Sequence, residues 1–134
     1  MAASPEIYWL TVTALVTGLL WLPYIGNQLL LMGLWQAVRN SDPAAVERSA
    51  WAMRAAAAHR NAVENLVVFA PLALAVHTLG VSSETTALAC MVYFWARVGH
   101  YVVYLFGIPL LRTLLFAVGV VCQLALAAAL LGVA

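Results

Sequence analysis

Four long apolar stretches follow one another along this chain, and short polar or turn-forming segments separate them. A helix needs about 20 apolar residues to cross the hydrocarbon core of a bilayer, and each stretch reaches that length. We therefore predict transmembrane helices over about residues 7–37, 43–79, 83–106 and 109–131. The short connections predict an up-down-up-down bundle, and residues 1–134 are expected to form a single domain.

The residues at the ends of these stretches predict where the helices begin, end and bend. Asp42 followed by Pro43 is typical of a helix start, in which a capping side chain precedes a proline in the first turn. Gly80 is expected to end the second helix. Pro23 and Gly26 lie within the first predicted helix, so we expect a kink or a loosened turn near its middle.

The composition places the chain among the integral membrane proteins. It has 134 residues, of which 66% are hydrophobic and 8% are charged, whereas about a quarter of the residues of a soluble domain are charged. The formal net charge is only +1, so we expect no nucleic-acid partner. The predicted fold class is an all-α, four-helix bundle that crosses the membrane several times.

The arginines near the helix ends predict the orientation of the bundle. The loop after the first helix carries Arg39, Arg48 and Arg54, and the third connection carries Arg112. Cytoplasmic loops are enriched in basic residues, so both connections are expected in the cytoplasm and both termini on the opposite side. If the source is a bacterium, the membrane would be the inner one.

The cysteines and histidines do not have the pattern of a metal site. Cys90 and Cys122 lie in apolar runs, where we expect small packing residues rather than a disulfide. No set of histidine, cysteine and acidic residues has the spacing of a zinc site, so no metal is predicted. His77 is expected at a membrane interface, and His59 should point about 100° away from the polar residues that follow it.

A polar cluster lies within the second predicted helix, in the string HRNAVEN. Arg60, Asn61 and Glu64 fall within about a third of the helix circumference, and Arg60 and Glu64 have the spacing of an ion pair. A guanidinium, an amide and a carboxylate on one face can hold a zwitterion: Glu64 an ammonium, Arg60 a carboxylate and Asn61 a peptide group. The alternative is a structural ion pair that joins helices.

A second polar stripe lies within the third predicted helix. Arg97, His100 and Tyr104 are spaced i, i+3 and i+7, which places a cation, an imidazole and a phenol on one side. Ionisable groups at membrane depth usually face a protein interior or a wet cavity and indicate a functional site. The alternative is that Tyr104 is an interfacial aromatic residue and that Arg97 extends its charge to the interface.

Arg112 and Thr113 lie at the start of the fourth predicted helix, near the same bilayer level as Tyr104. Taken alone, Arg112 is an ordinary arginine of a cytoplasmic connection. It becomes a candidate site residue because the two polar stripes converge on the same side of the membrane.

Four motifs, in the order in which they occur, resemble a known family of membrane proteins. They are DPAAVERS, AHRNAVENLVVFAP, ARVGHYVVYL and GIPLLRT. Over about residues 5–133, the chain is similar to the membrane-associated proteins in eicosanoid and glutathione metabolism, the MAPEG family. It particularly resembles short bacterial members and the microsomal prostaglandin E synthase and microsomal glutathione transferase branches.

The resemblance implies an assembly and a cosubstrate. Family members are four-helix transmembrane bundles that form homotrimers, and they bind glutathione between neighbouring subunits near the cytoplasmic side. A neighbouring subunit often adds a basic residue from its first helix or loop, for which Arg39, Asn27 and Gln28 are the candidates here. The positions that match the family's glutathione-binding residues are Arg60, Asn61, Glu64, Arg97, His100, Tyr104 and Arg112.

The implied activity is transfer of glutathione to a lipophilic electrophile, or reduction of a lipid hydroperoxide by glutathione. The catalytic residues implied are Arg112, Thr113 and Tyr104. A thiol has an ordinary pKa of about 8.5, and an adjacent cation such as Arg112 can lower it by about 1–3 units. Thr113 or Tyr104 would donate a hydrogen bond to the sulfur. The alternative is a non-catalytic membrane subunit of the same fold, or a lipid-binding accessory protein of a larger complex.

Overall fold

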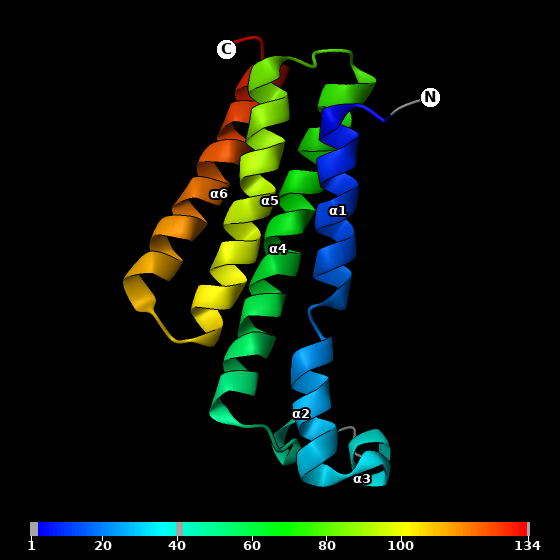
Figure 1. Ribbon diagram of the computed structural model, residues 1–134. Helices are drawn as coiled ribbons and strands as arrows, with labels where there is room; N and C mark the ends of the chain where they lie inside the picture. The colour runs from blue at the N-terminus through cyan, green and yellow to red at the C-terminus, as the bar shows by residue number, and fades with distance from the viewer. Residues whose placement is uncertain (1–2, 40–41, 134) are drawn as a thin grey trace.

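Four membrane-spanning segments form an antiparallel bundle in the computed structural model, which describes residues 3–39 and 42–133. The two ends of the chain lie at the same end of the bundle (Figure 1). The described residues form helices and turns without any strand, so the predicted all-α, four-helix membrane fold is confirmed. The elements are α1 (Pro5–Leu19), α2 (Leu22–Met32), α3 (Leu34–Arg39), the 3-10 turn η1 (Pro43–Ala45), α4 (Ala50–Thr78), α5 (Glu84–Leu105) and α6 (Pro109–Leu130).

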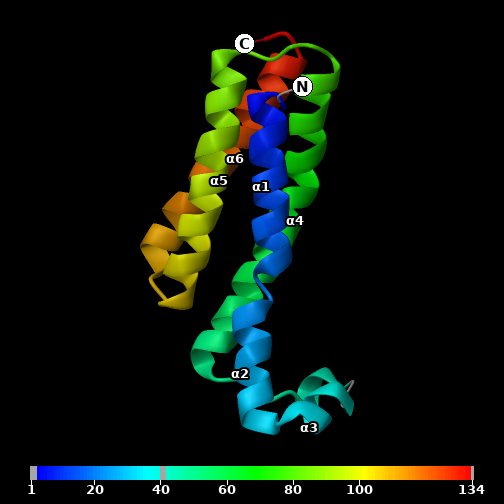
Figure 2. The ribbon, with the colours of Figure 1, turned by 45° about the vertical axis from the view of Figure 1, so that its right-hand side comes forward.

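The first span is divided, and the prediction of one helix over about residues 7–37 is wrong. α2 starts just ahead of Pro23, whose ring and missing N–H prevent α1 from continuing through it. The kink expected there is present, and α2 continues below α1 (Figure 2). The Tyr101 hydroxyl donates to the carbonyl of Leu20, between the two helices, at 3.2 Å. A second break follows at Gly33, where φ is +77° and the chain turns into α3.

The second span begins at Ala50, later than the predicted start near residue 43. The side chain of Asp42 accepts from the backbone N–H of Ala44 at 3.0 Å, but this cap starts only the single turn η1. Asn27 of α2 then binds Ser49 twice, because its Oδ1 accepts from the Ser49 N–H at 2.8 Å and its Nδ2 donates to the hydroxyl at 2.9 Å. These bonds hold the chain extended before α4, so a tertiary contact overrides the local helix signal.

A tight turn joins α5 to α6, and both helices lie within about a residue of their predicted ranges. Gly107 adopts φ +72°, and its N–H donates to the carbonyl of Tyr104 at 3.0 Å. Arg54 of α4 supports the same turn, since its Nε donates to the carbonyl of Leu105 at 2.8 Å. The turn therefore fixes the start of α6 beside the end of α5.

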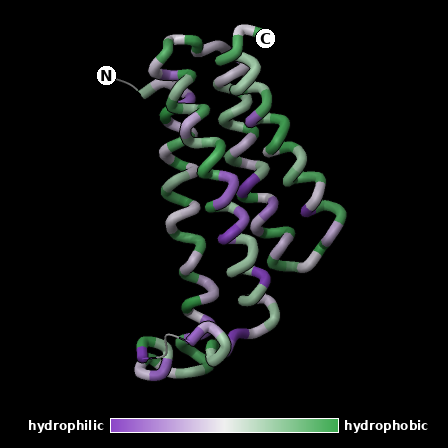
Figure 3. The backbone as a smooth tube through the Cα atoms, turned by 180° about the vertical axis from the view of Figure 1, so that it is seen from behind, coloured by the Kyte–Doolittle hydropathy of each residue, from purple (hydrophilic) through white to green (hydrophobic). Residues whose placement is uncertain are grey.

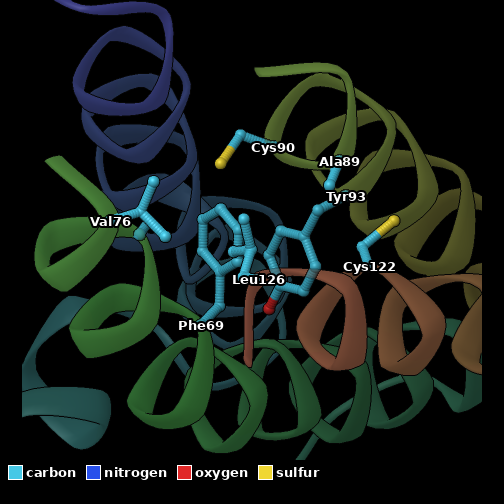
Figure 4. Close-up of a cluster of buried hydrophobic side chains, with 8 residues drawn as sticks. Phe69, Val76, Ala89, Cys90, Tyr93, Cys122 and Leu126 are labelled. Atoms are coloured by element: carbon cyan, nitrogen blue, oxygen red, sulfur yellow. The ribbon is translucent and has the colours of Figure 1, made fainter. Parts of the chain in front are cut away.

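The apolar core lies toward the end of the bundle that carries the termini. Phe69 of α4 stacks on Tyr93 of α5, with ring centroids 3.8 Å apart (Figure 4). Cys90 and Cys122 are buried free thiols beside these rings, as their apolar surroundings in the sequence predicted. Strongly hydrophilic segments of neighbouring helices lie close together near the middle of the bundle (Figure 3).

We expect Gly107→Ala to lower the free energy of unfolding by about 1–2 kcal/mol, because a Cβ disfavours the left-handed conformation of this turn. Gly18→Ala is the matched control, since Gly18 lies within α1 and has open space around its Cα. The control should be neutral or slightly stabilising. The measurement is thermal unfolding in detergent, and equal melting temperatures for the two variants would contradict the expectation.

Candidate functional site

Residues of α4, α5 and α6 form an open pocket of about 250 Å³, which we call the α5–α6 pocket. Residues from both predicted polar stripes and from the start of α6 meet here, as their shared bilayer level suggested. The turn at Gly107 brings them together, because it places the first turn of α6 beside the last turn of α5. The lining residues are Asn61, His100, Tyr104, Arg112, Thr113 and Phe116.

Arg97 lies buried behind this pocket and does not extend its charge to the membrane interface. Its Nη2 donates to Oδ1 of Asn61 and lies 3.3 Å from Nδ1 of His100. If Nδ1 of His100 accepts this bond, the imidazole carries its proton on Nε2. Nε and Nη1 of Arg97 have no hydrogen-bond partner within the described chain. Arg97 therefore fixes the side chains of Asn61 and His100, both of which line the pocket.

Arg112 supplies the positive charge at the mouth of the α5–α6 pocket. Its guanidinium lies over the ring of Tyr104, 4.5 Å from the centroid, and that ring lies 5.6 Å from the imidazole of His100. Among the described residues, no carboxylate or other acceptor binds the Arg112 guanidinium. The hydroxyl of Thr113 donates to the carbonyl of Pro109 at 3.1 Å, so it would have to rotate to donate to a ligand. The pocket is therefore suited to an anion.

Arg60 and Glu64 line a different cavity, of about 410 Å³ between α2 and α4, which we call the α2–α4 pocket. The expectation that Arg60, Asn61 and Glu64 share one face is therefore wrong, because Asn61 lies in the α5–α6 pocket. Consecutive helical residues point about 100° apart, which is enough to separate Arg60 from Asn61. The predicted ion pair is also absent, since in the described chain neither Arg60 nor Glu64 has a hydrogen-bond or ion-pair partner.

Three polar lining residues of the α2–α4 pocket were not predicted as site residues: Tyr24, Arg48 and His59. The expectation that His59 points away from the polar cluster is wrong, since it lines the same pocket as Arg60 and Glu64. The hydroxyl of Tyr24 lies 2.8 Å from Nδ1 of His59. The sequence carried one signal for this pocket: Tyr24 and Gln28 lie one helical turn apart in a largely apolar stretch.

Asn27 and Gln28, two of the three candidates for a residue donated to a neighbour, bind residues of their own chain. Both side chains are buried. Asn27 binds Ser49, and Oε1 of Gln28 accepts from the guanidinium of Arg48. The remaining candidate, Arg39, is exposed at the end of α3 and lines neither pocket.

The two pockets offer complementary chemistry. The α5–α6 pocket joins one unpaired guanidinium with an imidazole, a phenol, a hydroxyl and an amide, and its lining has no carboxylate. The α2–α4 pocket offers two guanidiniums and one carboxylate, which suits a ligand with carboxylates and an ammonium. In the described part of the chain, no three histidine, cysteine or acidic side chains lie together as metal ligands.

A comparison with known families agrees with this arrangement, in which four helices span the membrane and polar residues lie where α4, α5 and α6 meet. Comparison with curated proteins and with solved structures gives no match. The family model of the MAPEG family matches residues 7–132, nearly the whole chain. The chain therefore belongs to the MAPEG family.

Proposed function

We propose that this protein is a membrane-bound, glutathione-dependent transferase or peroxidase that activates the glutathione thiol for attack on lipophilic electrophiles or lipid hydroperoxides. The observation that carries the proposal is the guanidinium of Arg112, which lies over Tyr104 at the mouth of an open pocket and has no anionic partner in the described chain. A thiolate would complete this site. Family membership supports glutathione as the thiol.

Arg112 acts on the pKa of the bound thiol. A cation within about 4–6 Å of the sulfur favours the thiolate and lowers the thiol pKa by about 1–3 units. The released proton goes to water, and Tyr104 donates its hydroxyl hydrogen to the sulfur. Because the thiolate is the nucleophile, more thiolate at neutral pH means a faster reaction.

The two reactions differ in the atom that the sulfur attacks. In the transferase reaction, the thiolate forms a C–S bond with an electrophilic carbon, and either a leaving group departs or the displaced electron pair is protonated. In the peroxidase reaction, the sulfur takes the outer oxygen of a hydroperoxide, and the O–O bond breaks to release an alcohol. A second glutathione then reduces the resulting sulfenic acid, giving glutathione disulfide and water.

Glutathione is proposed to lie between two copies of the chain in a homotrimer. α2 and the α5–α6 hairpin lie on opposite sides of the lower half of α4 (Figures 1 and 2), so the two pockets open on different sides of that helix. Arg60 and Glu64 are exposed charged residues within a spanning helix. Such charges are costly next to lipid, and a neighbouring copy that covers them would remove that cost.

The second substrate is proposed to enter from the bilayer. Phe116 of α6 lines the pocket, and Leu110 and Leu114 are exposed apolar side chains of the same helix. A lipophilic electrophile or hydroperoxide dissolved in the membrane could reach the sulfur along this surface. The site would lie toward the cytoplasmic side, where glutathione is available, and both termini on the other side of a bacterial inner membrane.

The alternative is a non-catalytic MAPEG-fold subunit or a lipid-binding accessory protein, in which the polar residues only join helices. The bond of Arg97 with Asn61 favours it, because it links α5 to α4. This bond does not account for Arg112, Arg60 and Glu64, which bind no other described residue by a hydrogen bond or ion pair. We therefore prefer the enzyme.

We expect Arg112→Ala to lower the conjugation rate at neutral pH by about tenfold or more while glutathione still binds. Without the cation the thiol pKa rises, so the rate should recover as the pH increases. The measurement is kcat against pH with chlorodinitrobenzene, together with the ultraviolet absorbance of the thiolate. Glu84→Gln is the control because it removes a charge from an exposed residue outside both pockets. An unchanged rate in Arg112→Ala would remove this residue from the mechanism.

We expect glutathione to raise the melting temperature of the purified protein in detergent, and Arg60→Ala to weaken that effect. A ligand at about 100 times its dissociation constant adds about 2.7 kcal/mol of apparent stability. The measurement is a thermal-shift titration of both proteins. Absence of a saturable shift at millimolar glutathione in the wild type would overturn the proposed glutathione site.

We expect Arg60→Ala and Arg112→Ala subunits to restore each other when they are co-expressed. In a mixed ring, about a quarter of the composite sites would combine an intact α2–α4 pocket from one copy with an intact α5–α6 pocket from the next. Activity should therefore exceed that of either variant alone and approach about a quarter of the wild-type value. If the site lay within one chain, the mixture would show only the average of the two variants.

A further inference from the structure

The guanidinium of Arg48 is held firmly in the α2–α4 pocket, but its charge is not neutralised. Its Nε and Nη2 donate to Oε1 of Gln28 at 3.2 and 2.9 Å. Its face covers the ring of Tyr24, 4.8 Å from the centroid, and Tyr24 is itself bound to His59. Gln28 is buried and neutral, so it orients the guanidinium without cancelling the charge. In the part of the chain that the structure describes, no carboxylate pairs with Arg48.

The contacts of Arg48 leave donors for a ligand. A guanidinium carries five N–H groups, and Gln28 accepts from two of them, so three remain. A cation with a fixed orientation binds a carboxylate with a smaller loss of side-chain freedom than a mobile one. Arg48 therefore has the features of a preorganised carboxylate-binding residue.

The charges of the α2–α4 pocket specify a class of ligand. Its charged lining residues are Arg48, Arg60 and Glu64, which supply two cations and one anion. The complement of this set is a molecule with two carboxylates and one ammonium. Thiols with a single carboxylate would leave one guanidinium without a partner, and thiols that lack an ammonium would face an unpaired Glu64.

We propose that Arg48 is a binding residue that recognises one carboxylate of the thiol substrate, and that it supplies the selectivity for that carboxylate. This inference rests on the proposed function, because it assumes that the α2–α4 pocket holds the thiol substrate. In this arrangement Glu64 binds the ammonium, and Arg60 and Arg48 bind one carboxylate each. Gln28 and Tyr24 are positioning residues, because they act on the ligand through Arg48.

The experiment compares three ligands on the full-length protein in detergent. The first is glutathione, the second is its monoethyl ester at the glycine carboxylate, and the third is the analogue that lacks the glutamyl α-carboxylate. Dissociation constants are measured for the wild type and for Arg48→Gln, Arg48→Lys and Glu84→Gln. Glu84→Gln is the control, because it removes a charge from an exposed residue at the start of α5, outside both pockets.

The wild type should bind glutathione at least about tenfold more tightly than either analogue, because each analogue loses one charge-assisted contact. Arg48→Gln should weaken glutathione binding by about tenfold to a hundredfold. One of the two analogues should then bind Arg48→Gln as well as it binds the wild type, which identifies the carboxylate that Arg48 contacts. Arg48→Lys should retain part of the selectivity, and Glu84→Gln all of it.

Three results would overturn the inference. Wild-type protein could bind the analogues as tightly as glutathione, Arg48→Gln could bind glutathione normally, or it could lose affinity for all three ligands equally, as a merely structural residue would. These results are distinct from failure of the proposed function, in which the wild type itself shows no saturable glutathione binding. Because the wild-type comparison needs no variant, the test stands even if Arg48→Gln does not fold.

Discussion

Polar groups at membrane depth have to find partners inside the protein, and this requirement determines most of the polar contacts in the bundle. The break between α1 and α2 frees the carbonyl of Leu20, and Tyr101 from α5 donates a hydrogen bond to it. The end of α5 is supported in the same way by Arg54 of α4. The break within the first span and the tight turn between α5 and α6 are therefore both stabilised by side chains of neighbouring helices, which bind the carbonyls there.

The same requirement separates structural polar residues from residues that are available for a ligand. Arg97 is buried and binds Asn61, so its charge holds α4 and α5 together. Arg112, Arg60 and Glu64 have the opposite character, since they line open pockets and bind no other described residue by a hydrogen bond or ion pair. An unpaired charge in a spanning helix is costly. We therefore prefer the explanation that a ligand or a second copy of the chain covers Arg112, Arg60 and Glu64.

The sequence predicted those features that depend on local pattern. The apolar stretches located four spans, and Gly107 and Pro109 located the turn that brings Tyr104 close to Arg112. Features that depend on contacts between distant segments were not predictable. The helix signal at Asp42 produced only one turn, because Asn27 binds Ser49 from another helix. Arg48 and Gln28 are likewise 20 residues apart, and no spacing rule links them.

The division of Arg60 and Asn61 between two pockets bears on the assembly that the proposed function requires. These residues are adjacent in sequence, yet a rotation of about 100° along α4 directs them into different pockets. If one tripeptide contacts both pockets, each copy must present its α2–α4 pocket to one neighbour and its α5–α6 pocket to another.

A two-fold pair would have to bring both pockets against the same partner, although they open on different sides of α4. A contact between unlike surfaces instead repeats around a closed ring, in which every α4 serves two sites and the number of sites equals the number of subunits. A site shared in this way favours a closed ring, and the proposed homotrimer is the smallest ring beyond a two-fold pair.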